Sequence, residues 1–306
     1  MKLAFAGTPD FAATVLRSLL ASEHEVALVI SQPNRRRGRG RKLSATPVAE
    51  LAQDNGLPLR QPDRIGEAAE EISDYDALVV AAYGQILRPD TLYAARQGAW
   101  NVHASLLPAY RGAAPIERAI MTGEVETGIS VMRMDEGLDT GPVALQYPTP
   151  IPPEMTGGEL TQVLAELGAK AITEVISSLE DNSIILSQQD SVNATYAPKL
   201  EDEEKVIRWG ERVEKVHDLV RALAPHMGAR TFHPDVSGPI KALRSKILRH
   251  GLPQAEPGNI LPAQGRLLVT CGNGVLEIMT LQLAGGRPLA ADDFLRGRRL
   301  DGAFSF

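Results

Sequence analysis

Residues 3–30 read LAFAGTPDFAATVLRSLLASEHEVALVI, and this stretch decides the fold class. It opens with an apolar run at Leu3–Ala6 and a turn-forming Gly-Thr-Pro-Asp, which indicate a buried strand followed by a turn. Apolar side chains then recur at helical spacing between Phe11 and Leu20, and Val26–Ile30 forms a second apolar run. A strand, a helix and a strand in this order indicate a βαβ unit of a parallel α/β sheet.

The same alternation continues further along the chain. Continuous apolar runs at Ala77–Ala82, Trp100–His103 and Ile129–Met134 predict three more strands, as expected of strands covered on both faces. Helical patterns occupy Pro115–Met121 and about 157–180. The sequence therefore predicts a Rossmann-like, doubly wound α/β sheet, whose site should lie beyond the carboxyl ends of its strands.

The pattern changes after residue 180. Residues 181–205 are polar and end in the acidic run Glu201–Glu204, which indicates a linker. One amphipathic helix at about Glu211–Leu223 follows. After it come short β-like runs separated by Gly and Pro, at Ile240–Leu243, Leu267–Thr270 and Val275–Thr280. Many short strands with tight turns predict a small β-barrel.

The length and the composition are those of an ordinary globular protein. A chain of 306 residues exceeds one typical core, so we expect two domains. No apolar run reaches the roughly 20 residues that span a bilayer, and the N-terminus lacks a signal-peptide pattern. The single cysteine, Cys271, excludes a disulfide framework, and the six histidines lack zinc-type spacing. We expect a cytoplasmic monomer that requires neither a metal nor a membrane.

The net charge of −6 conceals an uneven distribution. Residues 1–205 contain 18 Lys and Arg against 29 Asp and Glu, whereas residues 206–306 contain 14 against 9. The first segment therefore carries −11 and the second +5. A basic C-terminal third on an acidic body is typical of proteins that bind a polyanion, although chance variation of surface charge gives the same pattern.

The densest group of polar residues follows the apolar run that ends at His103. Asn101 and His103 are two residues apart on a predicted strand, so their side chains share one face. A second group, Asp135–Gly141, includes Asp139 and follows the next apolar run. Because sites of doubly wound sheets lie beyond the ends of strands, we expect the two groups to meet at one edge of the sheet.

An amide, an imidazole and a carboxylate suit acyl transfer to an amine. Asn101 and His103 can donate hydrogen bonds to the oxyanion that forms when an amine attacks a carbonyl carbon. Asp139 can orient the imidazole and help to take a proton from the attacking ammonium group, which titrates near pH ~8. This chemistry requires no nucleophilic serine or cysteine.

Each of these residues also has a purely structural interpretation. His103 can be a core histidine, Asn101 can end its strand, and Asp139 can form a turn before Gly141. A serine nucleophile at Ser105 beside His103 is another alternative, but the G-x-S-x-G motif of that class of hydrolase is absent from the sequence.

Residues 35–42 read RRRGRGRK and carry six positive charges in eight residues. A solvated charge run is the simplest explanation. A compact βα connection is only ~2–6 residues long, however, and the connection from Gln32 to Thr46 is far longer, which favours a function. A mobile, arginine-rich loop suits phosphates and the end of an RNA, because arginine both forks onto phosphates and stacks on bases.

Four segments resemble those of the methionyl-tRNA formyltransferase family, and the resemblance covers essentially the whole chain. They are FAGTPDFA at 5–12, the basic loop at 32–43, NVHASLLP with YRGAAP at 101–115, and Asp135–Gly141. The Asn-x-His pair with a distant Asp is shared by all transferases and hydrolases that use 10-formyltetrahydrofolate, so it does not choose among them. The opening segment and the basic loop point to the tRNA enzymes.

The resemblance implies a reaction: the formyl group of 10-formyltetrahydrofolate passes to the α-amine of initiator methionyl-tRNA, for translation initiation. Asn101 and His103 would stabilise the oxyanion, and Asp139 would pair with His103 and manage protons. The residues implied to bind folate are Ser105, Leu106, Leu107 and Pro108. The residues implied to bind tRNA are Arg36, Arg37, Arg39, Arg41 and Lys42, with Arg39 probing the acceptor end.

The resemblance also implies a domain organisation: a formyltransferase catalytic domain at 1–189, a linker at 190–205, and an oligonucleotide-binding-like barrel at 206–306 that contacts tRNA. Candidate contacts in the barrel, left unranked, are Lys215, Arg221, Lys241, Arg244, Lys246 and Arg249. The basic loop departs from the family at Asn34, where an acid is common, and at Arg36, where a proline is common. Its stiffness is therefore left open.

Three other classes of protein share some of these features. A formyltransferase acting on another amine, such as a nucleotide sugar, or a 10-formyltetrahydrofolate hydrolase would share Asn101, His103 and Asp139 but has no need of the basic loop. A dinucleotide-binding dehydrogenase would share the strand that ends at Gly7, but the G-x-G-x-x-G fingerprint is missing. A non-enzymatic RNA-binding module would explain the barrel but not the three polar side chains.

Overall fold

The computed structural model describes residues 1–37, 42–251, 255–298 and 300–305, and at residues 36, 37, 42 and 43 it describes the backbone alone. The chain divides into two compact units. Unit 1 comprises Met1–Pro115, Glu126–Pro150 and Thr161–Pro198, and unit 2 comprises Ile116–Val125, Ile151–Leu160 and Lys199–Phe306. No helix among the described residues is long and apolar enough to cross a membrane.

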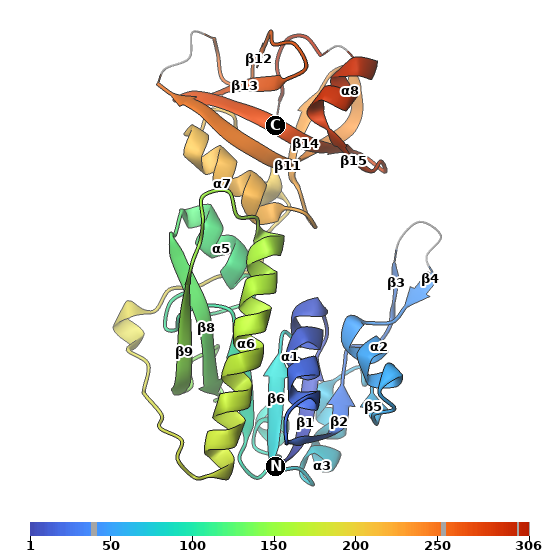
Figure 1. The fold of residues 1–306 in the computed structure, drawn as a ribbon, viewed down its shortest axis with the longest axis vertical. Coiled ribbons are helices and arrows are strands. Elements are labelled where there is room, and N and C mark those ends of the chain that lie inside the picture. The colour runs from blue at the N-terminus through green and yellow to red at the C-terminus, as the bar shows by residue number, and fades with distance from the viewer. Residues whose placement is uncertain (38–41, 252–254, 299, 306) are drawn as a thin grey trace. The chain divides into compact units, whose positions relative to one another are not determined.

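Unit 1 is built on a seven-stranded mixed sheet (Figure 1). Its strands are β1 (Lys2–Gly7), β2 (Glu25–Ile30), β5 (Leu59–Arg60), β6 (Ala77–Ala81), β7 (Ala99–His103), β8 (Glu126–Arg133) and β9 (Val143–Pro150), in the spatial order β5-β2-β1-β6-β7-β8-β9. The first five in that order are parallel, whereas β8 and β9 are antiparallel to their neighbours.

Helices cover both faces of this sheet. The helices that begin in unit 1 or run into it are α1 (Asp10–Leu20), α2 (Pro47–Asp54), α3 (Ala69–Ile72), α4 (Pro89–Leu92), α5 (Pro115–Thr122) and α6 (Gly157–Glu180), with short 3-10 turns η1 (Ile65–Ala68) and η2 (Ser191–Asn193). On one face α6 packs so closely that a Cβ on Gly168 would lie 2.6 Å from Val102. On the other face Ile65, Ile72 and Leu92 pack in the core with the strands. The predicted doubly wound, Rossmann-like arrangement is confirmed.

Strands β8 and β9 depart from the expected pattern. The run at 129–134 is a strand as predicted, but it is antiparallel to β7, which an apolar run alone does not reveal. The sequence of β9, VALQYPTP, was not recognised as a strand because it contains Pro148 and Pro150. Proline is tolerated at the edge of a sheet, and β9 is the edge strand.

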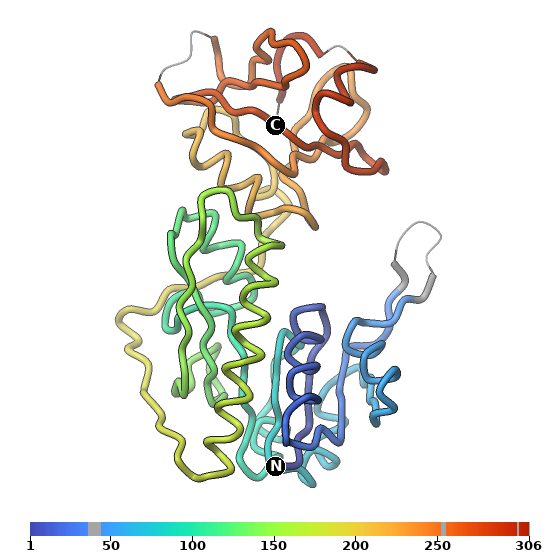
Figure 2. Tube along the Cα trace, viewed as in Figure 1, coloured from blue at the N-terminus to red at the C-terminus, as the bar shows by residue number. Residues whose placement is uncertain are grey.

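The polar segment after α6 is ordered against unit 1. The trace of this segment can be followed in Figure 2. Ser187 pairs with Val143 of β9, and Tyr196 forms a bridge with Arg111. Unit 1 accordingly extends to Pro198. The expected domain boundaries at residues 189 and 206 stay a prediction.

Unit 2 contains a curled antiparallel sheet. Its strands are β10 (Ala229–His233), β11 (Val236–His250), β12 (Ile260–Leu261), β13 (Leu267–Cys271), β14 (Gly274–Leu283) and β15 (Pro288–Ala290), ordered β10-β11-β14-β13-β12 with β15 on β14. The end of the chain bridges the two edges, because Ala303 pairs with Asn259 beside β12 and Ser305 pairs with Phe232 of β10. These bridges confirm the predicted small barrel.

Helices α7 (Val213–Leu223) and α8 (Ala291–Gly297) accompany the barrel, with a 3-10 turn η3 (Glu203–Lys205) before it. The apolar core contains Trp209 and Phe304, whose rings stack with their centroids 5.7 Å apart. The amphipathic helix expected at 211–223 corresponds to α7.

The basic segment begins and ends as a hairpin. Strands β3 (Arg35–Arg37) and β4 (Lys42–Ser44) are antiparallel, with Arg36 opposite Leu43 and Arg37 opposite Lys42. The sequence predicted a loop here, so the pairing of its two ends is a correction. Backbone hydrogen bonds between the two short strands pair the ends of the segment.

Candidate active site

The first two candidate residues lie at the carboxyl end of β7. Asn101 is opposite Val80 of β6, and His103 is one residue beyond the last β6–β7 pair. Because side chains alternate along a strand and Val102 faces α6, Asn101 and His103 share the opposite face, as predicted. His103 is buried and Asn101 is half-buried.

The third candidate, Asp139, reaches the same place by a different route from the one expected. We expected its segment to follow a strand ending at the same edge as β7. Strand β8 is antiparallel, and its last residue Arg133 lies opposite Trp100 at the start of β7. The loop after β8 instead turns back to bring Asp139 to Asn101 and His103. The predicted neighbours are correct, and the geometric reason given for them was wrong.

The three side chains meet within hydrogen-bonding or ion-pair distance. The amide Nδ2 of Asn101 donates to Oδ1 of Asp139 over 3.4 Å, a long hydrogen bond. Nδ1 of His103 lies 3.7 Å from Oδ2 of Asp139, the range of an ion pair but not of a hydrogen bond. The backbone N–H of Gly112 donates to the same Oδ2 over 2.8 Å and is the shortest of the three contacts.

The imidazole of His103 is also held from its other side. Its Nε2 lies 2.9 Å from the carbonyl oxygen of Tyr110. A carbonyl oxygen only accepts, so Nε2 carries the proton of this contact and Nδ1 is the nitrogen that faces Asp139.

Sequence reasoning gave no role to several residues that build this site. Gly112 has a φ of +121°, and a Cβ there would lie 2.8 Å from the carbonyl oxygen of Ala197, so only glycine places its N–H against Asp139. Arg111 is buried and bonds Gln189. The stretch Tyr110-Arg111-Gly112 was singled out only as part of the family resemblance. Gln189 was not singled out, because it is one polar residue within a polar segment.

The predicted folate-binding residues differ in exposure. Ser105 and Leu107 are buried, and the Ser105 hydroxyl donates to the carbonyl oxygen of Ala109 over 2.6 Å. Leu106 and Pro108 are half-buried. Folate binding by this segment stays a prediction.

The predicted tRNA-binding residues fall on the β3–β4 hairpin or beyond the described residues. Arg36, Arg37 and Lys42 belong to its strands, with their side chains outside the description, and Arg39 and Arg41 lie wholly outside it.

The base of the hairpin is fastened to the sheet. Gln32 Nε2 donates to Tyr83 O over 3.0 Å, and Gln61 Nε2 donates to Gln32 O and to Asn34 Oδ1 over 2.7 and 2.8 Å. Asn34, which departs from the family's usual acid, thus serves as an anchor. Three side chains and two backbone carbonyl groups are hydrogen-bonded at the base of the hairpin, and the stiffness of the loop beyond the base stays an open question.

The basic residues of unit 2 are not equivalent. Arg221 is buried and paired with Asp218, Arg244 is paired with Glu159, and Lys215 lies 3.6 Å from Glu211. Lys246 and Arg249 are exposed on β11, and Lys241 is half-buried.

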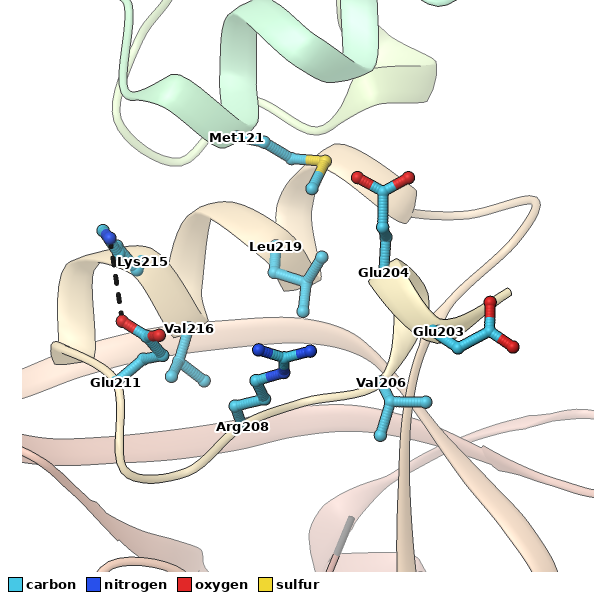
Figure 3. Close-up of a pocket in the computed structure, with 9 residues that line it drawn as sticks. All are labelled: Met121, Glu203, Glu204, Val206, Arg208, Glu211, Lys215, Val216 and Leu219. Atoms are coloured by element: carbon cyan, nitrogen blue, oxygen red, sulfur yellow. Dashed lines mark ion pairs between the residues drawn. The ribbon is translucent and has the colours of Figure 1, made fainter. Parts of the chain in front are cut away.

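A hollow of about 420 Å³ lies within unit 2 (Figure 3). Its wall combines apolar side chains such as Met121 and Leu219 with charged ones, and Arg208 projects between them. None of the residues predicted for catalysis or folate binding lines this hollow.

Two protein-family models match the chain. The model described as formyl transferase matches residues 1–176, and the model described as formyl transferase, C-terminal domain, matches residues 199–299. The chain belongs to the formyl transferase family. It is therefore an enzyme of the transferase class, as the sequence predicted.

Two full-length relatives of this formyltransferase carry the same name. The methionyl-tRNA formyltransferase of Rubrobacter xylanophilus is 62% identical over 303 residues, 99% of each chain. That of Methylobacterium nodulans is 45% identical over 308 residues, covering 98% of this chain and 97% of the relative. An N-formyltransferase from Helicobacter canadensis, crystallised with folinic acid and dTDP-3-aminofucose, is 18% identical with a TM-score of 0.68, covering 91% and 98% of the two chains, and shows the shared fold.

Proposed function

We propose that this formyltransferase transfers the formyl group of 10-formyltetrahydrofolate to the α-amine of initiator methionyl-tRNA, and that translation initiation in the cytoplasm uses the product. The observation that carries the proposal is the meeting of Asn101, His103 and Asp139 at the end of β7. The chain in which these three residues meet is 62% identical, over its full length, to a methionyl-tRNA formyltransferase.

The chemistry of these three side chains fits a formyl donor and an amine acceptor. The Asn101 amide has two N–H groups, of which one contacts Asp139 and the other is free to donate to a developing oxyanion. The Asp139 carboxylate is an acceptor for a proton of the α-ammonium group. Folate supplies the activated one-carbon unit when bound, and the half-buried Leu106 and Pro108 are the parts of the predicted folate segment best placed to touch it.

The reaction forms one C–N bond and breaks another. Asp139 accepts a proton from the α-ammonium group, and the neutral amine attacks the formyl carbon. Asn101 donates its second amide N–H to the negative charge on the formyl oxygen, and His103 adds a donor when its Nε2–H turns from the Tyr110 carbonyl oxygen to the formyl oxygen. The attacking nitrogen loses a second proton as the bond from the formyl carbon to the folate nitrogen breaks. One of the two protons moves to that folate nitrogen, and the other is released to solvent.

The acceptor is held by positive charge away from these three residues. The β3–β4 hairpin, through Arg36, Arg37, Arg39, Arg41 and Lys42, takes the acceptor end of the tRNA. The exposed Lys246 and Arg249 of the barrel contact phosphates of the tRNA body, because they are the candidates of unit 2 that are exposed and have no ion pair among the described contacts.

An acceptor panel tests the proposal. Purified enzyme is incubated with 10-formyltetrahydrofolate and either initiator methionyl-tRNA, free methionine or a nucleotide-linked amino sugar, and formylated products are measured by mass spectrometry. We expect formylmethionine on the tRNA and no comparable product from the other acceptors. Formylation of the amino sugar, or release of formate without transfer, contradicts the proposal and supports one of the alternatives given by the sequence.

A further inference from the structure

The loop between β8 and β9 carries Asp139 in a left-handed conformation. The φ of Asp139 is +52°, a region that few residues with a Cβ adopt, although Asp and Asn are found there more often than other residues. The ends of the loop are tied to the sheet, because Met134 N–H donates to Ala99 O over 2.8 Å and Arg133 N–H donates to Pro142 O over 2.9 Å. These contacts fix the ends but leave the conformation at Asp139 itself to other groups.

The side chain of Gln189 contacts the backbone on both sides of this position. Its Nε2 donates to the carbonyl oxygen of Asp139 over 2.9 Å and to that of Gly141 over 2.7 Å. Gln189 lies outside the loop, fifty residues further along the chain. One amide group therefore clamps the peptide groups that set the direction of the Asp139 side chain.

The other end of the same amide is held by Arg111. The buried guanidinium donates from Nε and Nη2 to Gln189 Oε1, over 3.1 and 2.8 Å. Two donors face the oxygen and two acceptors face the nitrogen, so the amide fits in one orientation. A carboxylate lacks the N–H groups that the loop requires, and an aliphatic side chain lacks both ends.

The backbone around Gln189 is fixed as well. Ser187 and Val143 exchange both of their backbone hydrogen bonds, each 2.9 Å long. Arg111 N–H donates to Thr195 O over 2.9 Å. The amide is therefore a rigid strut between two paired segments and not a mobile surface group.

We propose that Gln189 is a positioning residue for the catalytic carboxylate, oriented by Arg111. It holds Asp139 in the conformation that directs its carboxylate toward Gly112 N–H, Asn101 and His103. The inference rests on the proposed role of Asp139 in formyl transfer, and it adds a residue of the polar segment that precedes the barrel to the machinery of unit 1.

The substitution Gln189→Glu is the sharpest test. The introduced carboxylate has the same size and still accepts from Arg111, but it has no N–H for the two carbonyl oxygens. Gln188→Glu is the matched control, since it makes the same change at the exposed neighbouring residue. We expect Gln189→Glu to lower kcat by roughly 10–100-fold, the cost of misplacing a catalytic group by about an ångström, with the KM for the folate donor within about threefold of wild type. The control keeps wild-type kcat.

A pH profile separates positioning from a general loss of structure. Dividing the kcat of Gln189→Glu by that of wild type at each pH removes the effect of the groups that titrate in both enzymes. As pH falls, protonation gives the introduced carboxyl one O–H donor, so the ratio should rise. A ratio that stays flat with pH, a kcat near that of wild type, or a parallel loss of folate binding and thermal stability would overturn the inference.

The variant Asp139→Asn keeps this inference distinct from the proposed function. If Asp139→Asn retains activity, the catalytic role of Asp139 fails whatever Gln189→Glu does. If Asp139→Asn is inactive and Gln189→Glu is as active as wild type, the proposed function stands and the positioning role of Gln189 fails.

Discussion

The candidate active site and the C-terminal barrel use polar residues in opposite ways. In the site, Asp139 receives hydrogen bonds from Gly112 and Asn101, while Gln189 fixes its backbone. In the barrel, the interior is an apolar cluster around Trp209, and basic residues such as Lys246 lie on the surface. The proposed chemistry would thus depend on a few groups that cannot be exchanged, whereas the proposed tRNA binding by the barrel would depend on several charges that each contribute a part. Substitutions should separate the two regions by the size and kind of their effects.

The largest effect is expected at Asp139. The variant Asp139→Asn keeps the shape of the side chain, and asparagine tolerates the left-handed φ, so the loop should persist while proton transfer is lost. General acid–base groups contribute roughly 10²–10⁴-fold, and we expect kcat to fall by about 10³-fold. Initial rates with methionyl-tRNA give the result, and Glu136→Gln in the same loop is the control. A fall of less than threefold would mean that this carboxylate is not part of the chemistry.

A smaller but still large effect is expected from Gly112→Ala. A methyl group at this φ of +121° meets the carbonyl oxygen of Ala197, so the N–H that holds Asp139 must move. A misplacement of about 1 Å costs on the order of 10²-fold in rate. Gly56→Ala is the matched control: its φ is also positive, at +65°, but no atom lies within 4 Å of the new methyl group. Its effect should be limited to a stability loss of about 1–2 kcal/mol, measured by urea unfolding. Equal losses of kcat in the two variants would contradict the role given to Gly112.

Substitutions in the barrel should have weaker effects, and these effects should appear in the KM for methionyl-tRNA and not in kcat. Removing Lys246 and Arg249 together should raise the KM for methionyl-tRNA several-fold and leave kcat unchanged. Each lost phosphate contact should reduce the slope of log affinity against log salt by nearly one. Arg266→Ala is the control, because that guanidinium is paired with Glu277 over 2.7 and 2.8 Å. An unchanged salt slope in the double variant would remove these two residues from the tRNA-binding surface.

The smallest effect on activity is expected at Cys271. Burial raises the pKa of this thiol to about 12. The unfolded thiol ionises near pH ~8.5, so the folded state binds the proton more tightly and the barrel should lose stability as pH rises from there toward 12. The urea midpoint of wild type should therefore fall more steeply between pH 8 and 10 than that of Cys271→Ala, with no change in kcat at pH 7. Parallel pH dependences would show that the thiol is not protected by burial.

The fold could be predicted well wherever periodicity carried it. The apolar runs at β1, β2, β6 and β7 and the helical pattern of α6 all correspond to observed elements. Strand direction could not be predicted, because an apolar run does not show whether a strand is parallel or antiparallel to its neighbours. Strand β8 has the expected apolar pattern but is antiparallel to β7. Strand β9 was missed because its two prolines are compatible with a strand only at the edge of a sheet, and the edge is a property of the whole topology.

The sequence allowed the neighbours in the candidate site to be predicted, but not the scaffold that brings them together. Asn101 and His103 were found because two residues two apart on a strand share a face, and Asp139 because carboxylates follow the next strand. Gly112, Arg111 and Gln189 were not assigned roles, since each acts on a group that is distant in sequence. A hydrogen bond from a backbone N–H to a carboxylate cannot be predicted from the residue type of the donor, except that this position requires glycine.

The most direct test of the account is the single-turnover rate of formyl transfer to methionyl-tRNA, measured as enzyme concentration is raised to saturation. We propose that Asp139 takes part in the chemistry and that Lys246 and Arg249 hold the tRNA. Asp139→Asn should therefore stay about 10³-fold slow at saturation, whereas the Lys246→Ala and Arg249→Ala double variant should recover the full wild-type rate. Recovery of the Asp139 variant at high concentration, or a double variant that stays slow at saturation, would contradict it.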